Sequence, residues 1–295
     1  MDQKLVTLLT LVETGNYTKT ARRLSLTQPA VSQHVSRLEA ELGCKLLKRV
    51  QGRYSPTDEG KIVIQHAKRV QALEESLHQK LLDYRNHRRH FTIGVTHTTE
   101  SNILINVIAE YCNTHDGIVI NIISDDINIL YSKLKTFAID MAFVEGRITG
   151  SDISTLLLDT DSLILVVSPD HPLATRGNVT IPELQQEKLI MRLADSGTRK
   201  LFESHLMSKN LSLKDFKIIL EIDNIATIKD LIRKNLGVSI LAKSACQDEL
   251  SKGKLVALPI EDLSMIREIN MLYRKDFNQQ SFLDDLVRLY YKRSH

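Results

Sequence analysis

The first ninety residues carry apolar side chains at helical spacing. The first predicted helix is amphipathic, and its apolar residues stand at positions i, i+3, i+4 and i+7 on one face: Leu5, Leu8, Leu9 and Val12. Gly15 interrupts this pattern. A short second helix is predicted over residues 18–25, with Ala21 and Leu24 facing inward. The chain therefore opens with two short helices separated by a tight turn.

A third helix is predicted between Thr27, a good N-cap, and Gly43, a frequent helix terminator. One face is apolar and carries Val31, Val35, Leu38 and Leu42. The opposite face carries short or hydrogen-bonding side chains: Pro29, Ala30, Gln33, Ser36, Arg37 and Ala40. Gln and Arg can form paired hydrogen bonds with adenine and guanine edges in the major groove. The pattern is typical of the recognition helix of a helix-turn-helix, and the alternative is an ordinary amphipathic helix.

A hairpin and a long helix are predicted next. Residues 48–60 combine turn formers with basic side chains, which indicates a short hairpin. The long helix spans residues 57–84, and its apolar residues follow a seven-residue repeat with two further leucines: Val63, Val70, Leu77 and Tyr84, with Leu73 and Leu81. This spacing suits pairing with a second copy across a two-fold axis, and packing on its own domain is the alternative. Residues 85–90 form a polar linker.

From Phe91 onward, short β-rich runs alternate with helices. The predicted strands are 91–95, 117–123, 139–144, 162–168, 187–191, 216–222, 238–241 and 268–273. The predicted helices are 99–113, 126–138, 198–209, 224–236 and 279–293. This alternation predicts an α/β region with mostly parallel sheets, as one sheet or two lobes.

The charge is unevenly distributed along the chain. Residues 1–90 hold 16 Lys and Arg against 9 Asp and Glu, whereas residues 91–295 hold 23 against 27. A small basic domain is the usual electrostatic footprint of a nucleic-acid binder. No apolar run approaches the ~20 residues that span a bilayer. The first residues also lack the pattern of a secretory signal, so we expect the protein in the cytoplasm.

The residues that could carry metal or catalytic chemistry are scattered. Cys44, Cys112 and Cys246 lie far apart with no His/Cys cluster, which excludes a disulfide framework and a zinc site. The chain also lacks a glycine-rich phosphate loop and a G-x-S-x-G elbow. We therefore expect no metal, no cofactor and no catalytic residue.

One segment carries a family resemblance. "NYTKTARRLSLTQPAVSQHVSRLEAELGCKLLKR", followed after six residues by "PTDEG", resembles the winged helix-turn-helix of the bacterial LysR-type transcriptional regulators. The match runs without gaps over residues 1–60. Thr20, Leu47 and Pro56 depart from the family's usual Ala, Phe and Leu, and none of them is an expected DNA contact.

The resemblance implies an architecture for the whole chain. An all-α winged helix-turn-helix domain and a long linker helix would precede an α/β effector domain of two lobes, similar to periplasmic binding proteins. The implied limits are 1–58 for the DNA-binding domain, 59–90 for the dimerisation helix and hinge, and 91–295 for the effector-binding domain, with lobe I at 91–162 and 266–295 and lobe II at 163–265. It further implies a homo-oligomer, a dimer or a tetramer, on an inverted-repeat operator.

The expected DNA contacts lie in the third helix and the hairpin. They are Thr27, Gln28, Pro29, Ala30, Ser32, Gln33, Ser36, Arg37, Arg49, Arg53 and Tyr54. The helix residues would lie near bases or adjacent phosphates, and the hairpin residues suit the backbone or the minor groove. Arg22 and Arg23 are either phosphate contacts or solvated helix residues.

Two polar stretches, residues 94–101 and 192–203, each open a predicted helix in the α/β region. Hydroxyls and backbone N–H groups at a helix N-terminus bind anions. A cleft between two lobes would bring the two stretches together around a small, anionic effector. The candidates are Thr96, His97, Thr98, Thr99, Arg192, Ser196, Thr198 and Asn224. The alternatives are plain helix caps for the hydroxyl residues and a local hydrogen-bonding role for His97.

Three other functions compete with a ligand-responsive regulator. The α/β region could be a fused enzyme, which the missing catalytic motifs disfavour. It could be a solute-binding domain, which the missing export signal disfavours. The chain could also be a nucleoid-type binder without an effector, which the two hydroxyl-rich helix starts disfavour.

Overall fold

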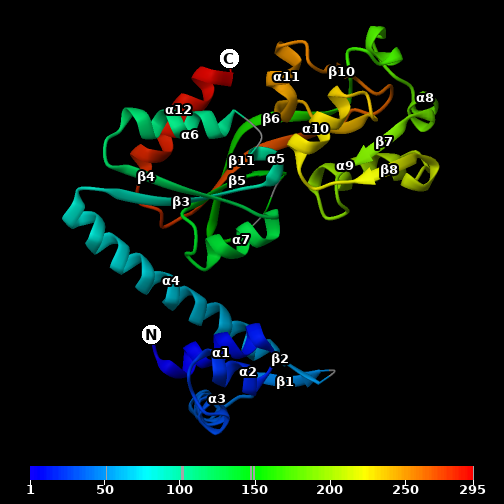
Figure 1. The fold of residues 1–295 in the computed structure, drawn as a ribbon. Helices are drawn as coiled ribbons and strands as arrows, with labels where there is room; N and C mark the ends of the chain where they lie inside the picture. The colour runs from blue at the N-terminus through cyan, green and yellow to red at the C-terminus, as the bar shows by residue number, and fades with distance from the viewer. Residues whose placement is uncertain (51, 101–102, 147, 149, 295) are drawn as a thin grey trace. The chain divides into compact units, whose positions relative to one another are not determined.

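The chain folds into two compact units in the computed structural model, which describes residues 1–50, 52–100, 103–146, 148 and 150–294 (Figure 1). The first unit comprises residues 1–90 with 135–138, and the second comprises residues 91–134 and 139–295. No helix in the described part of the chain is long and apolar enough to cross a bilayer.

Three short helices open the first unit: α1 (Gln3–Thr14), α2 (Tyr17–Arg23) and α3 (Gln28–Leu42). Each starts at a side chain that accepts backbone N–H groups, from Asp2, Asn16 and Thr27 respectively. Gly15 and Gly43 end α1 and α3 in the left-handed conformation. All three predicted helices are confirmed. Leu24, expected to face inward from the second helix, is its half-buried C-cap instead.

A hairpin links the three helices to a long helix. Strands β1 (Leu47–Val50) and β2 (Arg53–Pro56) pair antiparallel, and α4 runs over Asp58–Asn86. The Thr57 hydroxyl donates to the carbonyl of Lys45 at 2.6 Å and accepts from the N–H of Gly60 at 2.9 Å. A Cβ at Gly60 would lie 2.0 Å from the carbonyl oxygen of Leu46, so glycine permits this close approach. The hairpin is thereby fixed to the start of α4.

The end of α4 is joined directly to the first strand of the sheet. The Asp83 carboxylate accepts from the His90 backbone N–H at 3.0 Å, and its other oxygen lies 2.5 Å from His90 Nδ1. His87 ends the helix in the left-handed conformation, and β3 (Arg89–Val95) already begins two residues later. The prediction of a polar linker over residues 85–90 is therefore wrong, because helix and strand take up all but two of these residues.

The second unit is built on a seven-stranded sheet. Its order is β10-β6-β11-β5-β3-β4, with β9 also paired to β6. The strands beyond β3 are β4 (Ile118–Ser124), β5 (Met141–Glu145), β6 (Ile153–Val167), β9 (Ser239–Ala242), β10 (Val256–Leu258) and β11 (Ile266–Arg274). A separate parallel pair is formed by β7 (Lys188–Met191) and β8 (Lys217–Glu221).

The prediction of mostly parallel strands is wrong for the centre of the sheet. β11 pairs antiparallel with both β5 and β6, and β6 pairs antiparallel with β9 and β10. The cause is the length of β6, whose first part lies beside β11 while residues 163–167 lie beside β9 and β10. β6 and β11 thus cross between two lobes. The pairing of β3 with β5 is parallel, as predicted.

Helices cover both faces of the sheet in the first lobe (Figure 1). α6 (Leu104–Thr114) and α12 (Gln280–Ser294) share one apolar core, and α7 (Ile127–Lys135) packs in another. The second lobe holds α9 (Gly197–Ser208) and α10 (Ile225–Arg233) over β7, β9 and the end of β6. Shorter elements complete the chain: α5 (His97–Glu100), α8 (Ile181–Gln186), α11 (Gln247–Ser251), η1 (Pro172–Thr175), η2 (Leu213–Asp215) and η3 (Ser244–Cys246).

The helix predicted over residues 99–113 divides into α5 and α6. Residues 101 and 102 of that prediction lie outside the described residues. β10, α8, α11 and the first nine residues of β6 were not predicted.

The three cysteines carry free thiols. Cys44 and Cys112 are half-buried, and Cys246 is buried. Burial raises the pKa of Cys112, and it raises the pKa of Cys246 to about 12. A thiol with so high a pKa stays protonated near neutral pH and is a poor nucleophile.

Candidate functional site

α3 presents the face of small and polar side chains to solvent. Val31, Val35 and Leu38 are buried against the other helices. The exposed residues include seven of the expected DNA contacts: Thr27, Gln28, Pro29, Ser32, Gln33, Ser36 and Arg37. Ala30 is half-buried, and Leu42, expected on the apolar face, is 48% exposed because it lies at the very end of the helix. A partner whose surface carries a long groove could therefore approach this helix closely.

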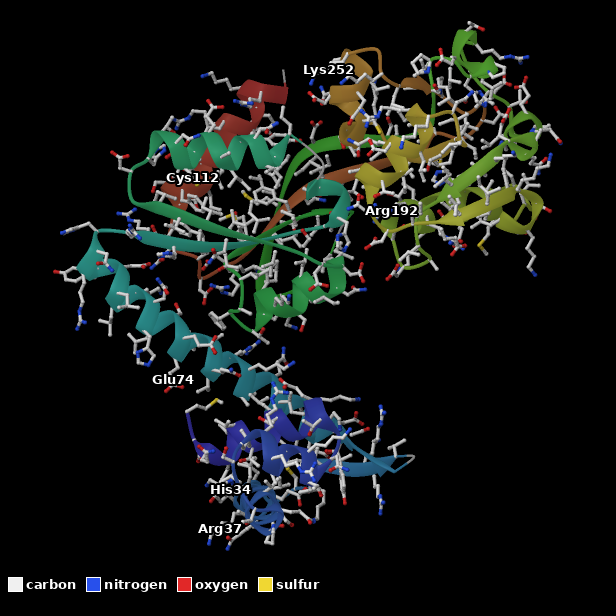
Figure 2. The ribbon with its side chains drawn as sticks, in the orientation of Figure 1. His34, Arg37, Glu74, Cys112, Arg192 and Lys252 are labelled. Carbon is white, nitrogen blue, oxygen red and sulfur yellow. The ribbon has the colours of Figure 1, made fainter. Side chains whose placement is uncertain are left out.

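A hydrogen bond fixes α3 on α1. His34 Nδ1 lies 2.9 Å from the hydroxyl oxygen of Thr7, which is fully buried. Figure 2 labels His34 and Arg37, which lie one turn apart on α3. The first side chain holds the helix in place, and the second is left free to reach a ligand.

The hairpin offers two exposed arginines and one anchoring tyrosine. Arg49 and Arg53 are paired in the antiparallel ladder with Tyr54 and Val50, respectively, and both are exposed. Tyr54 is half-buried, with its ring edge-on to Tyr17 at 4.7 Å between centroids. Its backbone N–H donates to the carbonyl of Gly15 at 3.2 Å. Tyr54 therefore ties the hairpin to the helices, whatever else it contacts.

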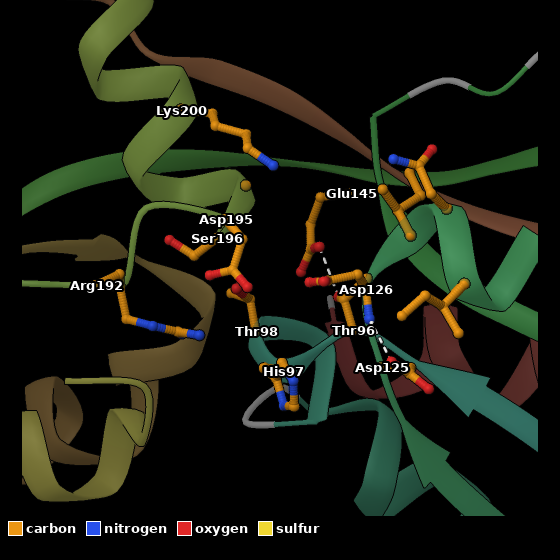
Figure 3. A pocket seen from close by; sticks show the side chains of 14 residues that line it. Thr96, His97, Thr98, Asp125, Asp126, Glu145, Arg192, Asp195, Ser196 and Lys200 are labelled. Atoms are coloured by element: carbon orange, nitrogen blue, oxygen red, sulfur yellow. Dashed lines mark hydrogen bonds between the residues drawn. The ribbon is translucent and has the colours of Figure 1, made fainter. Parts of the chain in front are cut away.

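The second unit holds a cavity of about 170 Å³ between its two lobes (Figure 3). From the first lobe it is lined by Thr96, His97, Thr98, Asp125, Asp126, Ile127, Asn128, Ile129 and Glu145. From the second lobe it is lined by Arg192, Asp195, Ser196, Gly197 and Lys200. The two hydroxyl-rich stretches that the sequence singled out do face one cavity.

The Glu145 carboxylate organises the first lobe's wall. Its two oxygens accept hydrogen bonds from the hydroxyls of Thr96 at 2.6 Å and Thr99 at 2.8 Å. These two hydroxyls also lie 2.9 Å from each other. Thr96 and Thr99 are thus already engaged, and Thr98 is the threonine of this wall for which no such bond is seen among the described residues.

Arg192 dominates the second lobe's wall. Its side chain is only 2% exposed, and Nη2 donates to Asp223 at 3.0 Å. Its Nε and Nη1 atoms are buried without a hydrogen-bond partner among the described residues. Burial lowers the pKa of Arg192, with Asp223 acting in the opposite direction, yet a guanidinium stays charged in proteins. A buried charge with two unused donors calls for an acceptor that a ligand can supply.

Ser196 and Lys200 add to this wall. The Ser196 hydroxyl caps α9 by accepting from the N–H of Arg199 at 3.2 Å. Lys200 lies one turn further along the same helix, and its exposed side chain points into the cavity (Figure 3). The N-terminal end of a helix carries a partial positive charge, which adds to that of the two cations.

Three of the eight expected effector residues lie outside the cavity. Thr99 is buried behind Thr96 on Glu145, and the Thr198 hydroxyl accepts from Arg267 at 3.4 Å. Asn224 is exposed and caps α10 by accepting from the N–H of Thr227 at 2.9 Å. Asn224 is therefore a helix cap, and its side chain does not line the cavity. The other five line the cavity: Thr96, His97, Thr98, Arg192 and Ser196.

Sequence reasoning missed the cavity's acidic residues and one lysine: Asp125, Asp126, Glu145, Asp195 and Lys200. Asp125 and Asp126 directly precede α7. Glu145 ends β5, and the end of a strand in an α/β sheet is where ligands commonly bind. That position was the available signal.

Comparisons with known proteins agree with this architecture. Residues 3–61 match the family model "Bacterial regulatory helix-turn-helix protein, lysR family", and residues 85–293 match "LysR substrate binding domain". The chain belongs to the LysR family, and it is a DNA-binding transcriptional regulator rather than an enzyme. The predicted fold class, a winged helix-turn-helix followed by a two-lobed α/β domain, is confirmed.

Individual relatives are similar to this chain over much of its length. The transcriptional regulator YeiE of Escherichia coli is 29% identical over 255 residues, which cover 86% of this chain and 85% of the relative. CbnR, solved with its target DNA, superimposes with a TM-score of 0.66 at 16% identity over 99% of both chains. The CcmR regulatory domain of Synechocystis, solved with 2-PG, has a TM-score of 0.59 at 21% identity, over 68% of this chain and 97% of its own.

Proposed function

We propose that the protein binds an inverted-repeat operator through α3, with the hairpin against the DNA backbone or minor groove. The observation that carries this proposal is the exposed face of α3, where short polar side chains and Arg37 stand opposite the buried Val31, Val35 and Leu38. Short side chains let a helix enter the major groove, and Gln and Arg supply base contacts. The proposed contacts are Thr27, Gln28, Pro29, Ala30, Ser32, Gln33, Ser36, Arg37, Arg49, Arg53 and Tyr54. CbnR, solved with its target DNA, supports DNA binding by a protein of this fold.

The proposed operator requires two copies of the chain. Seven apolar residues of α4 are exposed by 44% or more, and five of them follow one stripe: Val70, Leu73, Leu77, Leu81 and Tyr84. Pairing two such stripes would remove them from water, and the two copies of α3 would then be related by one two-fold axis. We propose a dimer built on α4, which assembles further into a tetramer on DNA.

The cavity between the lobes is the proposed effector site. Two unpaired N–H donors of Arg192 favour a small metabolite with an anionic group, assisted by Ser196 and Thr98. CcmR, solved with 2-PG, supports a small-molecule ligand in this fold. The effector must bind one arrangement of the lobes more tightly than another in order to change DNA binding.

The domain division follows the same proposal. The proposed limits remain 1–58 for DNA binding, 59–90 for the dimerisation helix and hinge, and 91–295 for the effector domain. The crossing strands β6 and β11 support a lobe boundary near residues 163 and 265. Since its partner is the chromosome, we place the protein in the cytoplasm.

The proposed function is tested by selecting binding sites from random duplex DNA with the full chain. We expect an inverted repeat whose half-sites are centred about one helical turn or a multiple apart, roughly 10 base pairs per turn. The affinity should fall steeply as the salt concentration rises, because phosphate contacts release counterions. Enrichment of no sequence, or of a single unrepeated half-site, would contradict the proposal.

A further inference from the structure

The two walls of the cavity carry opposite charges. The first lobe contributes three carboxylates, Asp125, Asp126 and Glu145, and no Lys or Arg among the described lining residues. The second lobe contributes the two cations, Arg192 and Lys200, with one carboxylate, Asp195. In Figure 3 the side chains of Arg192 and Lys200 extend from the second lobe toward the first, where Glu145 and Asp126 lie. A ligand between them meets an acidic surface on one side and a basic surface on the other.

The basic wall is arranged for an acid group. Arg192 is almost wholly buried, and its Nε and Nη1 have no partner among the described residues. Each of these N–H groups can donate a charge-assisted hydrogen bond to a carboxylate or a similar acid group. Lys200 and the first turn of α9 lie beside it in the same wall.

The acidic wall is not neutralised to the same extent. Asp125 is paired with Lys133 at 2.9 Å, and Glu145 is held by threonine hydroxyls, with Arg267 at 3.9 Å. The half-buried Asp126 carboxylate accepts no hydrogen bond from any described residue. A carboxylate at the edge of a cavity, next to a second one, favours a cationic donor such as an ammonium group.

We propose that the effector is a zwitterion, whose acid group binds Arg192 and whose protonated amine binds Asp126 and Glu145. This inference rests on the proposed effector site in the same cavity. A purely anionic ligand would satisfy Arg192 but face the carboxylates of the first lobe. A purely cationic ligand would leave the buried guanidinium without an acceptor. A zwitterion contacts both lobes through opposite charges, and therefore favours the arrangement in which they lie close together.

The test uses matched probes on the full-length protein. Thermal melting and isothermal titration compare the common α-amino acids with the α-hydroxy acids and the amino-acid amides of the same carbon skeletons, and with inorganic sulfate. We expect at least one amino acid to raise the melting temperature. Its hydroxy acid, which lacks the ammonium, and its amide, which lacks the acid, should each bind at least tenfold more weakly.

Variants separate the two walls. The substitution Asp126→Asn should lower the affinity for the amino acid at least tenfold, and it should leave the affinity for sulfate unchanged or raise it. The substitution Arg192→Gln should abolish binding of the amino acid and of sulfate. The control is Asp116→Asn, which removes an exposed carboxylate outside the cavity and should change neither affinity. The decisive comparison is between Asp126→Asn and the wild type. Since Asp126 is only half-buried, this comparison remains informative even if the variant of the buried Arg192 fails to fold.

The outcomes distinguish this inference from the proposed function. If hydroxy acids or sulfate bind and no amino acid does, the zwitterion is wrong and the anion site stands. The same holds if an amino acid and its hydroxy acid bind equally. If no probe binds, sulfate included, the proposed effector cavity fails and the inference fails with it.

Discussion

Arg267 and Asp161 form a buried ion pair where the chain crosses between the lobes. Arg267 Nη2 lies 3.3 Å from Asp161 Oδ2, and the two residues are direct partners on β11 and β6. Arg267 also donates to the Thr198 hydroxyl at 3.4 Å, and Asp161 accepts from the Ser244 hydroxyl at 2.8 Å. Thr198 and Ser244 belong to the second lobe, so the pair connects the crossing strands to it.

This pair predicts a large stability effect. Arg267→Met leaves the Asp161 carboxylate buried without its counter-charge, which typically costs about 3–5 kcal/mol. The double variant Arg267→Met/Asp161→Asn removes both charges and should lose clearly less. Urea unfolding of both variants beside the wild type measures the difference. A loss under about 1 kcal/mol for the single variant would show that the pair contributes no more than a surface ion pair.

The junction of α4 and β3 predicts a pH dependence. Burial acts to raise the pKa of Asp83, but hydrogen bonds from Gln79 and His90 hold this pKa below its usual value of 3.8. A lowered folded pKa means that the carboxylate stabilises the fold fully above the unfolded pKa. This stabilisation is lost as the pH falls through the folded pKa.

Asp83→Asn should therefore reduce the unfolding free energy by about 1–3 kcal/mol at neutral pH. The deficit should stay constant down to about pH 5 and shrink below the unfolded pKa, as the wild-type carboxylate is also protonated. Denaturant unfolding at several pH values checks this, with Asp116→Asn as the exposed control. A deficit independent of pH down to pH 3 would contradict the role of the ionised carboxylate.

The stripe on α4 predicts the oligomeric state. Leu77 is 56% exposed in the single chain, and each buried leucine contributes about 1.5–3 kcal/mol. Leu77→Asp acts in both copies, so the dimer dissociation constant should rise at least about a hundredfold. Sedimentation velocity measures it, and circular dichroism verifies that the helix is retained.

The matched control is Lys68→Asp, on the opposite side of the same helix, which should leave the dimer intact. If Leu77→Asp sediments like the wild type at every concentration, α4 is not the dimer contact.

The first unit could be predicted almost wholly from the sequence because its signals are local. Thr27 and Gly43 mark the ends of α3 by their own capping chemistry, and the buried residues of α1 and α3 follow helical spacing. The early start of β6 was missed for a physical reason. Residues 153–161 include exposed leucines and two aspartates, so they do not form the continuous apolar run of a buried strand.

The cavity could be predicted only in part. The stretches around Thr96 and Ser196 were found, since hydroxyls before a helix are visible in the sequence. The same signal cannot separate a ligand contact from a cap, since Ser196 lines the cavity and also caps α9. The acidic wall is assembled from residues after β4 and at the end of β5, and only the folded sheet brings them together.

The most direct test of the account is the affinity of Arg37→Ala for the selected operator, measured by fluorescence anisotropy. Arg37 is exposed on the polar face of α3, and the loss of one such contact typically costs about 1–3 kcal/mol, or roughly 5- to 150-fold in affinity. We predict this loss with the dimer and the melting temperature unchanged. Operator binding equal to that of the wild type would contradict the assignment of α3 as the recognition helix.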